Sequence, residues 1–172
     1  QERTGESVPM PYQSLREFIT RLEDSGRLVR VKTPVSSHLE MTEIQTRVLA
    51  AGGPAILFEN VIRADGQKSD MPVLVNLFGT VERVAWGMDR EPHQLREVGE
   101  TLAFLKQPEP PGGWREALEM LPLLKTVMAM KPKTVGGAPC QEVVLTRNDI
   151  DLNKLPIQGC WPGEPAPLIT WP

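Results

Sequence analysis

Apolar residues recur at helical spacing near the start of the chain. The apolar positions are Leu15, Phe18, Ile19 and Leu22, which line one face of a helix. Ser14 and Glu17 have the spacing of a capping box, and Gly26 suits the left-handed residue that ends many helices. The pattern therefore predicts a helix that begins after Ser14 and ends near Gly26.

Four further helices are predicted from the same periodicity. The first opens with a second capping box, Ser37 with Glu40, and carries apolar residues up to Leu49 before Gly52 and Gly53 close it. The others cover residues 81–88, 95–105 and 114–128, the last of them interrupted at Pro122. Proline causes such an interruption because it lacks the backbone donor of a helical hydrogen bond.

Shorter segments have the pattern of β-strands. Residues 28–35 alternate, and we expect Val29, Val31 and Thr33 on the buried face. Residues 55–58 and 73–77 are continuously apolar, which is typical of strands covered on both faces. Residues 142–146 and 168–171 are expected to be strands as well. Helices interspersed with such strands predict an α+β fold, a small mixed sheet flanked by helices.

Proline divides the chain into two parts of different character. Six of the 17 prolines lie in residues 1–106 and eleven in residues 107–172. The first part has the composition of a compact domain, whereas the second resembles connectors and short strands. We expect a disordered tail or a cloning remnant at residues 1–11, a domain at 12–132, and the beginning of a second domain at 133–172.

Charge and hydropathy exclude two classes of protein. Lys and Arg number 19 and Asp and Glu 22, a net charge of −3, so the chain lacks the basic excess with which proteins bind nucleic acid by bulk charge. No apolar run approaches the roughly 18–20 residues that span a bilayer. Cys140 and Cys160 are too far apart for the paired spacing of a zinc site, and we expect free, reduced thiols in a cytoplasmic protein.

Common catalytic motifs are absent from the sequence. It contains no glycine-rich phosphate loop and no H-E-x-x-H helix. His38 and His93 are the only imidazoles, and neither has a nearby sequence partner that would orient a general base. Asp149, Asp151 and Asn153 imitate the start of a calcium loop without its later ligands, so we expect a surface turn. The residues by themselves assign no catalytic, cofactor-binding or metal-binding position.

Longer stretches of the sequence resemble the UbiD-type decarboxylases, a family that includes the 3-polyprenyl-4-hydroxybenzoate decarboxylases of ubiquinone synthesis. The stretches are residues 39–44 (LEMTEI), 51–60 (AGGPAILFEN), 71–80 (MPVLVNLFGT), 95–99 (LREVG), 105–111 (LKQPEPP), 137–141 (GAPCQ), 151–157 (DLNKLPI), 160–162 (CWP) and 166–171 (APLITW). The resemblance runs from Tyr12 to Trp171.

The resemblance implies a decarboxylase of aromatic acids that uses prenylated FMN with Mn²⁺ and K⁺. The modified flavin would serve as the electron sink of the reaction. In the family, the catalytic, metal-binding and flavin-phosphate residues follow the Ile-Thr-Trp strand, so the resemblance assigns none of them to this sequence. Residues 133–172 would be the incomplete start of a split β-barrel flavin domain, with Thr170 near the flavin.

The leading interpretation is therefore the N-terminal portion of a UbiD-type decarboxylase that is inactive by itself. The alternatives are a non-enzymatic assembly or interaction module and a flavin-binding accessory protein. We also expect a homo-oligomer that forms through residues 133–172, because the strands at 142–146 and 168–171 would have exposed edges. Residues 12–131 should fold independently, and truncation of Phe18, Ile44 or Leu102 should cost about 2–5 kcal/mol each if they are fully buried.

Overall fold

The computed structural model describes residues 12, 14–106, 112–119, 121–129, 132, 134, 136–138, 141–164 and 169. The described residues form two compact units. The first contains those of 12–92 and 150–169, and the second those of 93–149. The sequence predicts a different division of the chain, into domains at residues 12–132 and 133–172. That division remains a prediction.

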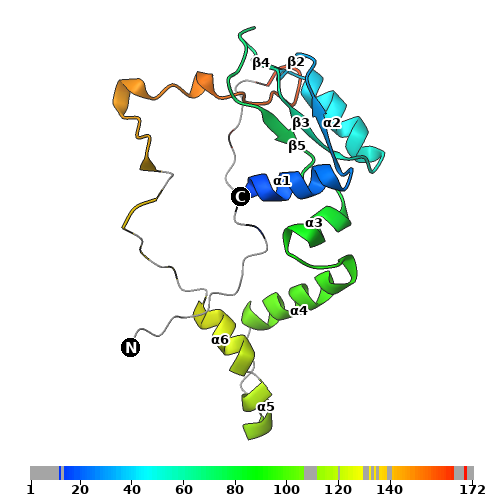
Figure 1. Ribbon diagram of the computed structural model, residues 1–172, viewed down its shortest axis with the longest axis vertical. Coiled ribbons are helices and arrows are strands. Elements are labelled where there is room, and N and C mark those ends of the chain that lie inside the picture. Colours follow the sequence, from blue (N-terminus) through cyan, green and yellow to red (C-terminus); the bar gives the residue numbers. More distant parts are fainter. Residues whose placement is uncertain are drawn as a thin grey trace. The chain divides into compact units, whose positions relative to one another are not determined.

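The first unit is built on a three-stranded sheet (Figure 1). Its strands are β1 (Leu28–Val31), β3 (Ala55–Phe58) and β5 (Val73–Val75), in the order β1-β3-β5. β1 runs parallel to β3, and β5 runs antiparallel to it. A separate parallel pair joins β2 (Val35–Ser36) to β4 (Val61–Ile62). This mixed sheet with its helices confirms the predicted α+β class.

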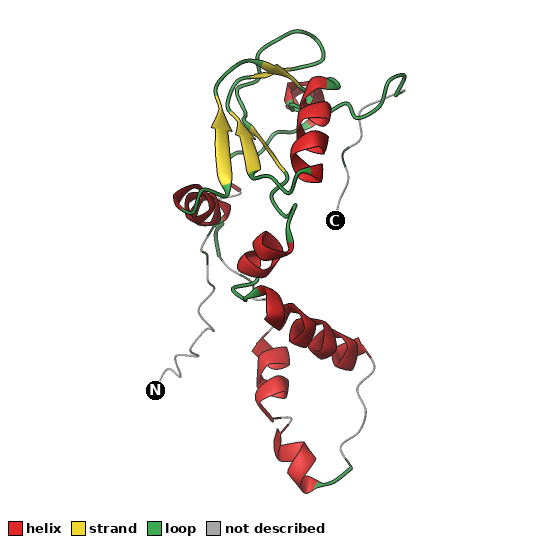
Figure 2. Cartoon of the chain, turned by 90° about the vertical axis from the view of Figure 1, so that its right-hand side faces the viewer, coloured by secondary structure: helices red, strands yellow, loops and turns green. Residues whose placement is uncertain are grey.

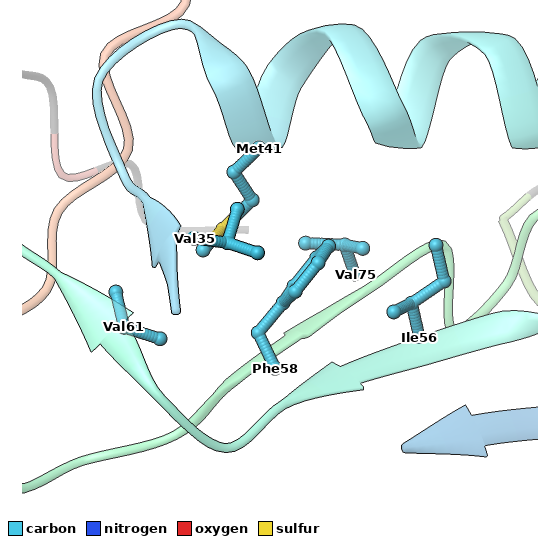
Figure 3. Packing of buried hydrophobic residues seen from close by; sticks show 6 residues of the cluster. All are labelled: Val35, Met41, Ile56, Phe58, Val61 and Val75. Carbon is cyan, nitrogen blue, oxygen red and sulfur yellow. The ribbon is translucent and has the colours of Figure 1, made fainter. Parts of the chain in front are cut away.

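Helices cover both faces of the sheet. One face packs against α2 (Glu40–Ala50), and the buried residues there are Val35, Met41, Ile56, Phe58, Val61 and Val75 (Figure 3). The other face packs against α1 (Leu15–Asp24) and Trp86 of α3 (Val81–Gly87), with Phe18, Leu22, Leu28, Ala55 and Leu57 buried. Figure 2 shows the strands in yellow with helices around them. Every residue of β3 is buried, as its continuous apolar run predicted.

The ends of α1 match the sequence pattern, but its cap does not. Gly26 has a φ of 68°, and the backbone N–H of Arg27 donates to the carbonyl oxygen of Leu22 beside it. These are the features of a helix that ends through a left-handed glycine. Ser14 stands at the N-cap, yet its side chain makes no capping hydrogen bond.

The strand predicted at residues 28–35 is shorter than expected. β1 ends at Val31, and the chain continues into β2 in the other pair of strands. The prediction that Val29 and Thr33 face the core is wrong, because both are exposed. The physical reason is that β1 lies at the edge of the sheet, where only Leu28 is buried and Val31 is half-buried.

Arg83 of α3 is buried, with only 1% of its surface exposed. The apolar positions Val81 and Met88, which the spacing places on the inner face, are exposed instead. The guanidinium donates to three backbone carbonyl oxygens, those of Gly53 (3.0 Å), Asn76 (3.1 Å) and Leu77 (3.1 Å). Burial lowers the pKa of the Arg83 guanidinium below its ordinary value. α3 is therefore oriented so that Arg83, which can donate to these carbonyls, faces inward.

An ion-pair network joins α1 to the sheet. Arg30 of β1 contacts Glu23 at 2.6 Å and Glu59 at 2.9 Å. The hydrogen bond from Arg30 lowers the pKa of the Glu23 carboxyl below its ordinary value of 4.5. Because the folded-state pKa is the lower one, the network stabilises the fold above about pH 4.5 and less as the carboxyl is protonated.

The stability difference between the wild type and Glu23→Gln should therefore depend on pH. We expect the wild type to be the more stable protein at neutral pH, and the difference to shrink as the pH falls through the folded-state pKa of Glu23. Urea unfolding of both proteins between about pH 2 and 7 measures this difference. A difference that stays constant over this range would contradict the assignment.

The second unit consists of helices and short turns. It contains α4 (Leu95–Lys106), α5 (Trp114–Glu119), α6 (Leu121–Ala129) and the 3₁₀ turn η3 (Arg147–Asp149). The helix predicted at 114–128 restarts at Leu121, so that Pro122 lies in a first turn, where its missing N–H costs little. Leu102 of α4 is 58% exposed, which makes its predicted core role wrong.

The strand predicted at residues 142–146 is wrong. These residues are exposed and have no strand partner within the described part of the chain; Val143, for example, is 78% exposed. A short apolar segment forms a strand only where another strand pairs with it. The predicted strand at 168–171 lies outside the described residues except for Ile169, and so does the tail at 1–11.

Candidate functional site

The structure does not bring the chemically reactive residues together. His38 and His93 are both exposed, and Cys160 is a half-buried free thiol, while Cys140 lies outside the described residues. Asp151 caps the 3₁₀ turn η4 (Leu152–Lys154), which confirms the predicted surface turn. In the described ranges, no three His, Cys, Asp or Glu side chains lie close enough together to hold a metal ion.

A different group of residues meets across a long stretch of sequence. Gly159 forms a parallel bridge with His38, beside the first turn of α2. The N–H of Leu39 donates to the carbonyl of Gly159 at 3.0 Å, and the N–H of Gly159 donates to the carbonyl of Ser37 at 2.9 Å. In Figure 1 the orange segment after residue 150 reaches the β2–β4 pair at this point.

The side chain of Thr42 completes this contact. Its hydroxyl donates to the carbonyl of Gly159 at 3.1 Å and accepts from Nε2 of Gln158 at 2.8 Å. One residue of α2 thus binds both the backbone and a side chain of the distant segment. We call this set of contacts, between Ser37, Leu39 and Thr42 on one side and Gln158 and Gly159 on the other, the Gly159 clasp.

Leu39 adopts a strained backbone conformation at the centre of the clasp. Its φ is 65° and its ψ is −43°, and the N–H of Glu40 donates to the carbonyl of His38 at 2.8 Å. This is a γ-turn with positive φ, which is rare for a residue with a branched side chain. The turn makes Leu39 the N-cap of α2, so the predicted capping role of Ser37 is wrong.

The carboxylate of Glu40 binds the backbone N–H of a different residue from the one that the predicted capping box requires. It accepts from the N–H of Ser36 at 2.7 Å, and the hydroxyl of Ser36 accepts from the N–H of His38 at 3.1 Å. Ser37, by contrast, is fully buried, and the described residues offer its hydroxyl no hydrogen-bond partner. The polar network before α2 is therefore centred one residue earlier than the sequence suggests.

A side chain at position 159 would meet the imidazole of His38. A Cβ at this position would lie 2.8 Å from Nδ1 of His38, closer than such atoms approach in proteins. A second tether lies nearby, where Nη1 of Arg63 donates to the carbonyl of Asn153 at 2.7 Å. The arrangement can hold the segment around Gly159 in place.

Family models identify the two sides of the clasp. The model of the 3-octaprenyl-4-hydroxybenzoate carboxy-lyase N-terminal domain matches residues 19–102. The model of the Rift-related domain of the same carboxy-lyase matches residues 133–172. The chain belongs to the UbiD family. The predicted resemblance to UbiD-type decarboxylases is thereby confirmed, and the family is one of carboxy-lyases.

Solved structures of UbiD-class enzymes are similar to part of the chain. An evolved dimeric form of HmfF from Pelotomaculum thermopropionicum, in complex with prFMN, shares 28% identity over 58% of this chain and 21% of its own, with a TM-score of 0.45. The closed form of vanillic acid decarboxylase from Sedimentibacter hydroxybenzoicus shares 25% identity over 60% of this chain and 22% of its own, with a TM-score of 0.46. The UbiD-family chain described here covers about a fifth of each.

The clasp thus joins the two matched parts of this UbiD-family chain. Ser37, Leu39 and Thr42 lie in the N-terminal-domain match, whereas Gln158 and Gly159 lie in the Rift-related match. Sequence reasoning missed this contact because no local pattern links residues more than a hundred positions apart. The only local signal was the word LEMTEI at residues 39–44, which contributed to the family resemblance without indicating a partner.

The described residues do not fit the metal that the family resemblance implies. An Mn²⁺ site needs several oxygen or nitrogen ligands from side chains that converge, and no such group occurs among the residues that the structure describes. We therefore derive no reaction step through a metal or flavin from these residues. Among the described helices, none combines the length and apolar character needed to cross a membrane.

Proposed function

We propose that the chain supplies the N-terminal domain and the beginning of the flavin domain of a decarboxylase that acts on aromatic acids of the 4-hydroxybenzoate type. The observation that carries the proposal is the consecutive match of two domain models of one carboxy-lyase, in the order 19–102 and 133–172. A role of the parent protein in ubiquinone biosynthesis, in the cytoplasm, belongs to the same proposal. The hydroxybenzoate named in the family's description supports the ubiquinone part of this proposal.

The cofactor part of the proposal places prenylated FMN, Mn²⁺ and K⁺ in the parent enzyme and assigns none of their ligands to this chain. When bound, the flavin supplies the electron sink that decarboxylation needs. Within this chain, the described residues contribute the packed sheet and the clasp, which hold the start of the flavin domain. Thr170, proposed to lie near the flavin, is outside the described residues.

Self-association through residues 133–172 stays a prediction, with less support than the sequence suggested. Residues 142–146 form no strand, so they present no strand edge to a neighbouring chain. Gly159 already pairs within this chain, through its bridge with His38. The support that remains is the exposure of apolar side chains such as Val143, Trp161 and Ile169.

The 172-residue chain should release no CO₂ from 4-hydroxybenzoic acid or other aryl acids, even with prenylated FMN, Mn²⁺ and K⁺. The same residues in one polypeptide with a complete Rift-related domain should release it. The reason is that the family resemblance assigns no catalytic position to this sequence. The assay measures CO₂ for both proteins, with flavin-free samples as the control.

Two results would contradict the proposal in different ways. Flavin-dependent CO₂ release by the 172-residue chain would show that it is active alone. No release by the longer polypeptide, with any aryl acid, would contradict the decarboxylase function and favour the alternative of an assembly module. The exposed Trp114, Leu118 and Met128 of α5 and α6 are the surface that such a module would use.

A further inference from the structure

We propose that the backbone of residues 37–39, directly after β2, and the first turn of α2 form a strand-docking groove that fixes the Rift-related part of the chain to the N-terminal domain and favours glycine at its central position. The occupant is this chain's own segment at residues 157–160. The inference rests on the proposed function, because it identifies the contact that holds two domains of the proposed enzyme together. Its test does not depend on activity.

The groove recognises its occupant through the backbone. Gly159 accepts from the N–H of Leu39 and donates to the carbonyl of Ser37, the hydrogen-bond pattern of a parallel bridge at His38, two residues after the end of β2. Strand addition of this kind gives affinity through main-chain hydrogen bonds, and selectivity comes from the side-chain positions. Thr42 adds selectivity for the residue before the glycine, because its hydroxyl accepts from the amide of Gln158.

Selection of glycine comes from His38. A Cβ at position 159 would lie 2.8 Å from Nδ1 and 3.6 Å from Cε1 of the imidazole, so a side chain there requires the imidazole to leave its place. Gly136, in contrast, has no atom within 4 Å of such a Cβ and a φ that other residues adopt. The two glycines therefore differ in whether a Cβ would meet a neighbouring atom, which is the property that the proposal concerns.

Backbone strain supports a functional role for the groove. Leu39 keeps a positive φ although it is neither glycine nor asparagine, and its N–H is bound by the carbonyl of Gly159. Strained residues persist where surrounding contacts over-determine them, and they are frequent at binding sites. The clasp supplies such contacts, because the occupied groove holds the N–H of Leu39 in place.

Covalent connection favours this chain's own segment over one from a second copy. The contacts would be the same in both cases, but a linked segment binds at an effective concentration in the millimolar range for a short flexible connection, and less for longer ones. The second unit connects the two sides within one chain. Occupation by the same chain therefore dominates at the micromolar concentrations of ordinary solution experiments.

A double-mutant cycle on the complete chain tests the glycine selection. We expect Gly159→Ala to speed hydrogen exchange of the Leu39 amide about tenfold or more, while amides of β3 are unaffected. The matched control Gly136→Ala should change it less than about twofold. In His38→Ala/Gly159→Ala, the imidazole is gone, and the Leu39 amide should return to the rate of His38→Ala alone.

The results that overturn the proposal are specific. An unchanged Leu39 amide in Gly159→Ala would show that the position does not select glycine. Fast exchange that persists in the double variant would show that His38 is not the selecting group. Gly159→Ala could also disturb the whole first unit. The double variant then still tests the proposal, because slow exchange of the Leu39 amide returns only if the contact between the Cβ and the imidazole caused the disturbance.

A peptide experiment tests the groove as a binding site. A synthetic heptapeptide with the sequence of residues 155–161 (LPIQGCW) is added to Gly159→Ala, in which the groove is open. We expect saturable NMR shifts at the amides of Leu39 and Thr42. The same peptide with valine in place of its glycine should produce none. Equal shifts with both peptides, or shifts with neither, would overturn the proposal.

Discussion

Replacement of Arg83 by methionine is expected to lower the free energy of unfolding by about 3–5 kcal/mol, because several hydrogen bonds from a charged donor are lost and each contributes about 1.5–3 kcal/mol. The substitution keeps most of the side-chain volume but deletes the guanidinium. It removes the hydrogen bonds to the carbonyls of Gly53 and Leu77 and one of those to Asn76, whose carbonyl still accepts from the N–H of Gly79. Each such loss carries the desolvation penalty of a buried acceptor.

Two variants control for this prediction. Arg83→Lys keeps the charge but not the fork of donors, so it should be less destabilised than Arg83→Met. Arg47→Met removes an exposed arginine that pairs with Glu43 four residues earlier, and should cost less than about 0.5 kcal/mol. Urea unfolding at neutral pH measures all three. Equal effects at positions 83 and 47 would contradict the structural role of Arg83.

Replacement of Phe58 by alanine is expected to cost about 3–5 kcal/mol, because the ring is fully buried at the end of the central strand and its loss leaves a cavity. Figure 3 shows it among Val35, Ile56 and Val75, between the sheet and α2. Phe18, which is 4% exposed on the opposite face, should behave similarly.

Leu102 provides the matched comparison. The same truncation, Leu102→Ala, should cost less than about 1 kcal/mol because the side chain is 58% exposed. Urea unfolding of both variants, followed by far-UV circular dichroism, which reports on the helices and strands of both units, gives the comparison. A Leu102 effect as large as that of Phe58 would mean that α4 is covered in solution.

The sequence predicted the centre of the sheet well. The continuous apolar run of β3 indicated burial on both faces, and all four of its residues are buried. The stripe on α1 indicated its packing face, where Phe18 and Leu22 are buried. These predictions succeed because the periodicity of a buried element is fixed by its own geometry, whatever lies against it.

The sequence failed where the partner decides the outcome. The alternation at residues 28–35 could not reveal that β1 is an edge strand with Val29 exposed. The helical spacing of α3 could not reveal that three carbonyls turn Arg83 inward and leave Val81 outside. The apolar content of residues 142–146 suggested a strand, yet no partner strand exists among the described residues to pair with it.

The candidate site shows the same limit more strongly. The γ-turn at Leu39 follows from no propensity of leucine, and Ser37 with Glu40 suggested an ordinary capping box instead. Glycine at 159 could be interpreted from sequence only as a flexible residue. Its meaning depends on His38, which lies 121 positions earlier in the chain, and only the folded structure brings the two together.

The clasp also affects how the protein is made. The hydroxyl of Thr42 donates to the carbonyl of Gly159, which is synthesised 117 residues later. At a synthesis rate of about 5–20 residues per second, the edge of residues 37–39 that Gly159 covers stays unpaired for roughly 6–23 s after it emerges from the ribosome. During that interval an unpaired strand edge faces other nascent chains. Chaperone dependence of the protein in cells should therefore be set by the arrival of Gly159, well after the sheet itself has formed.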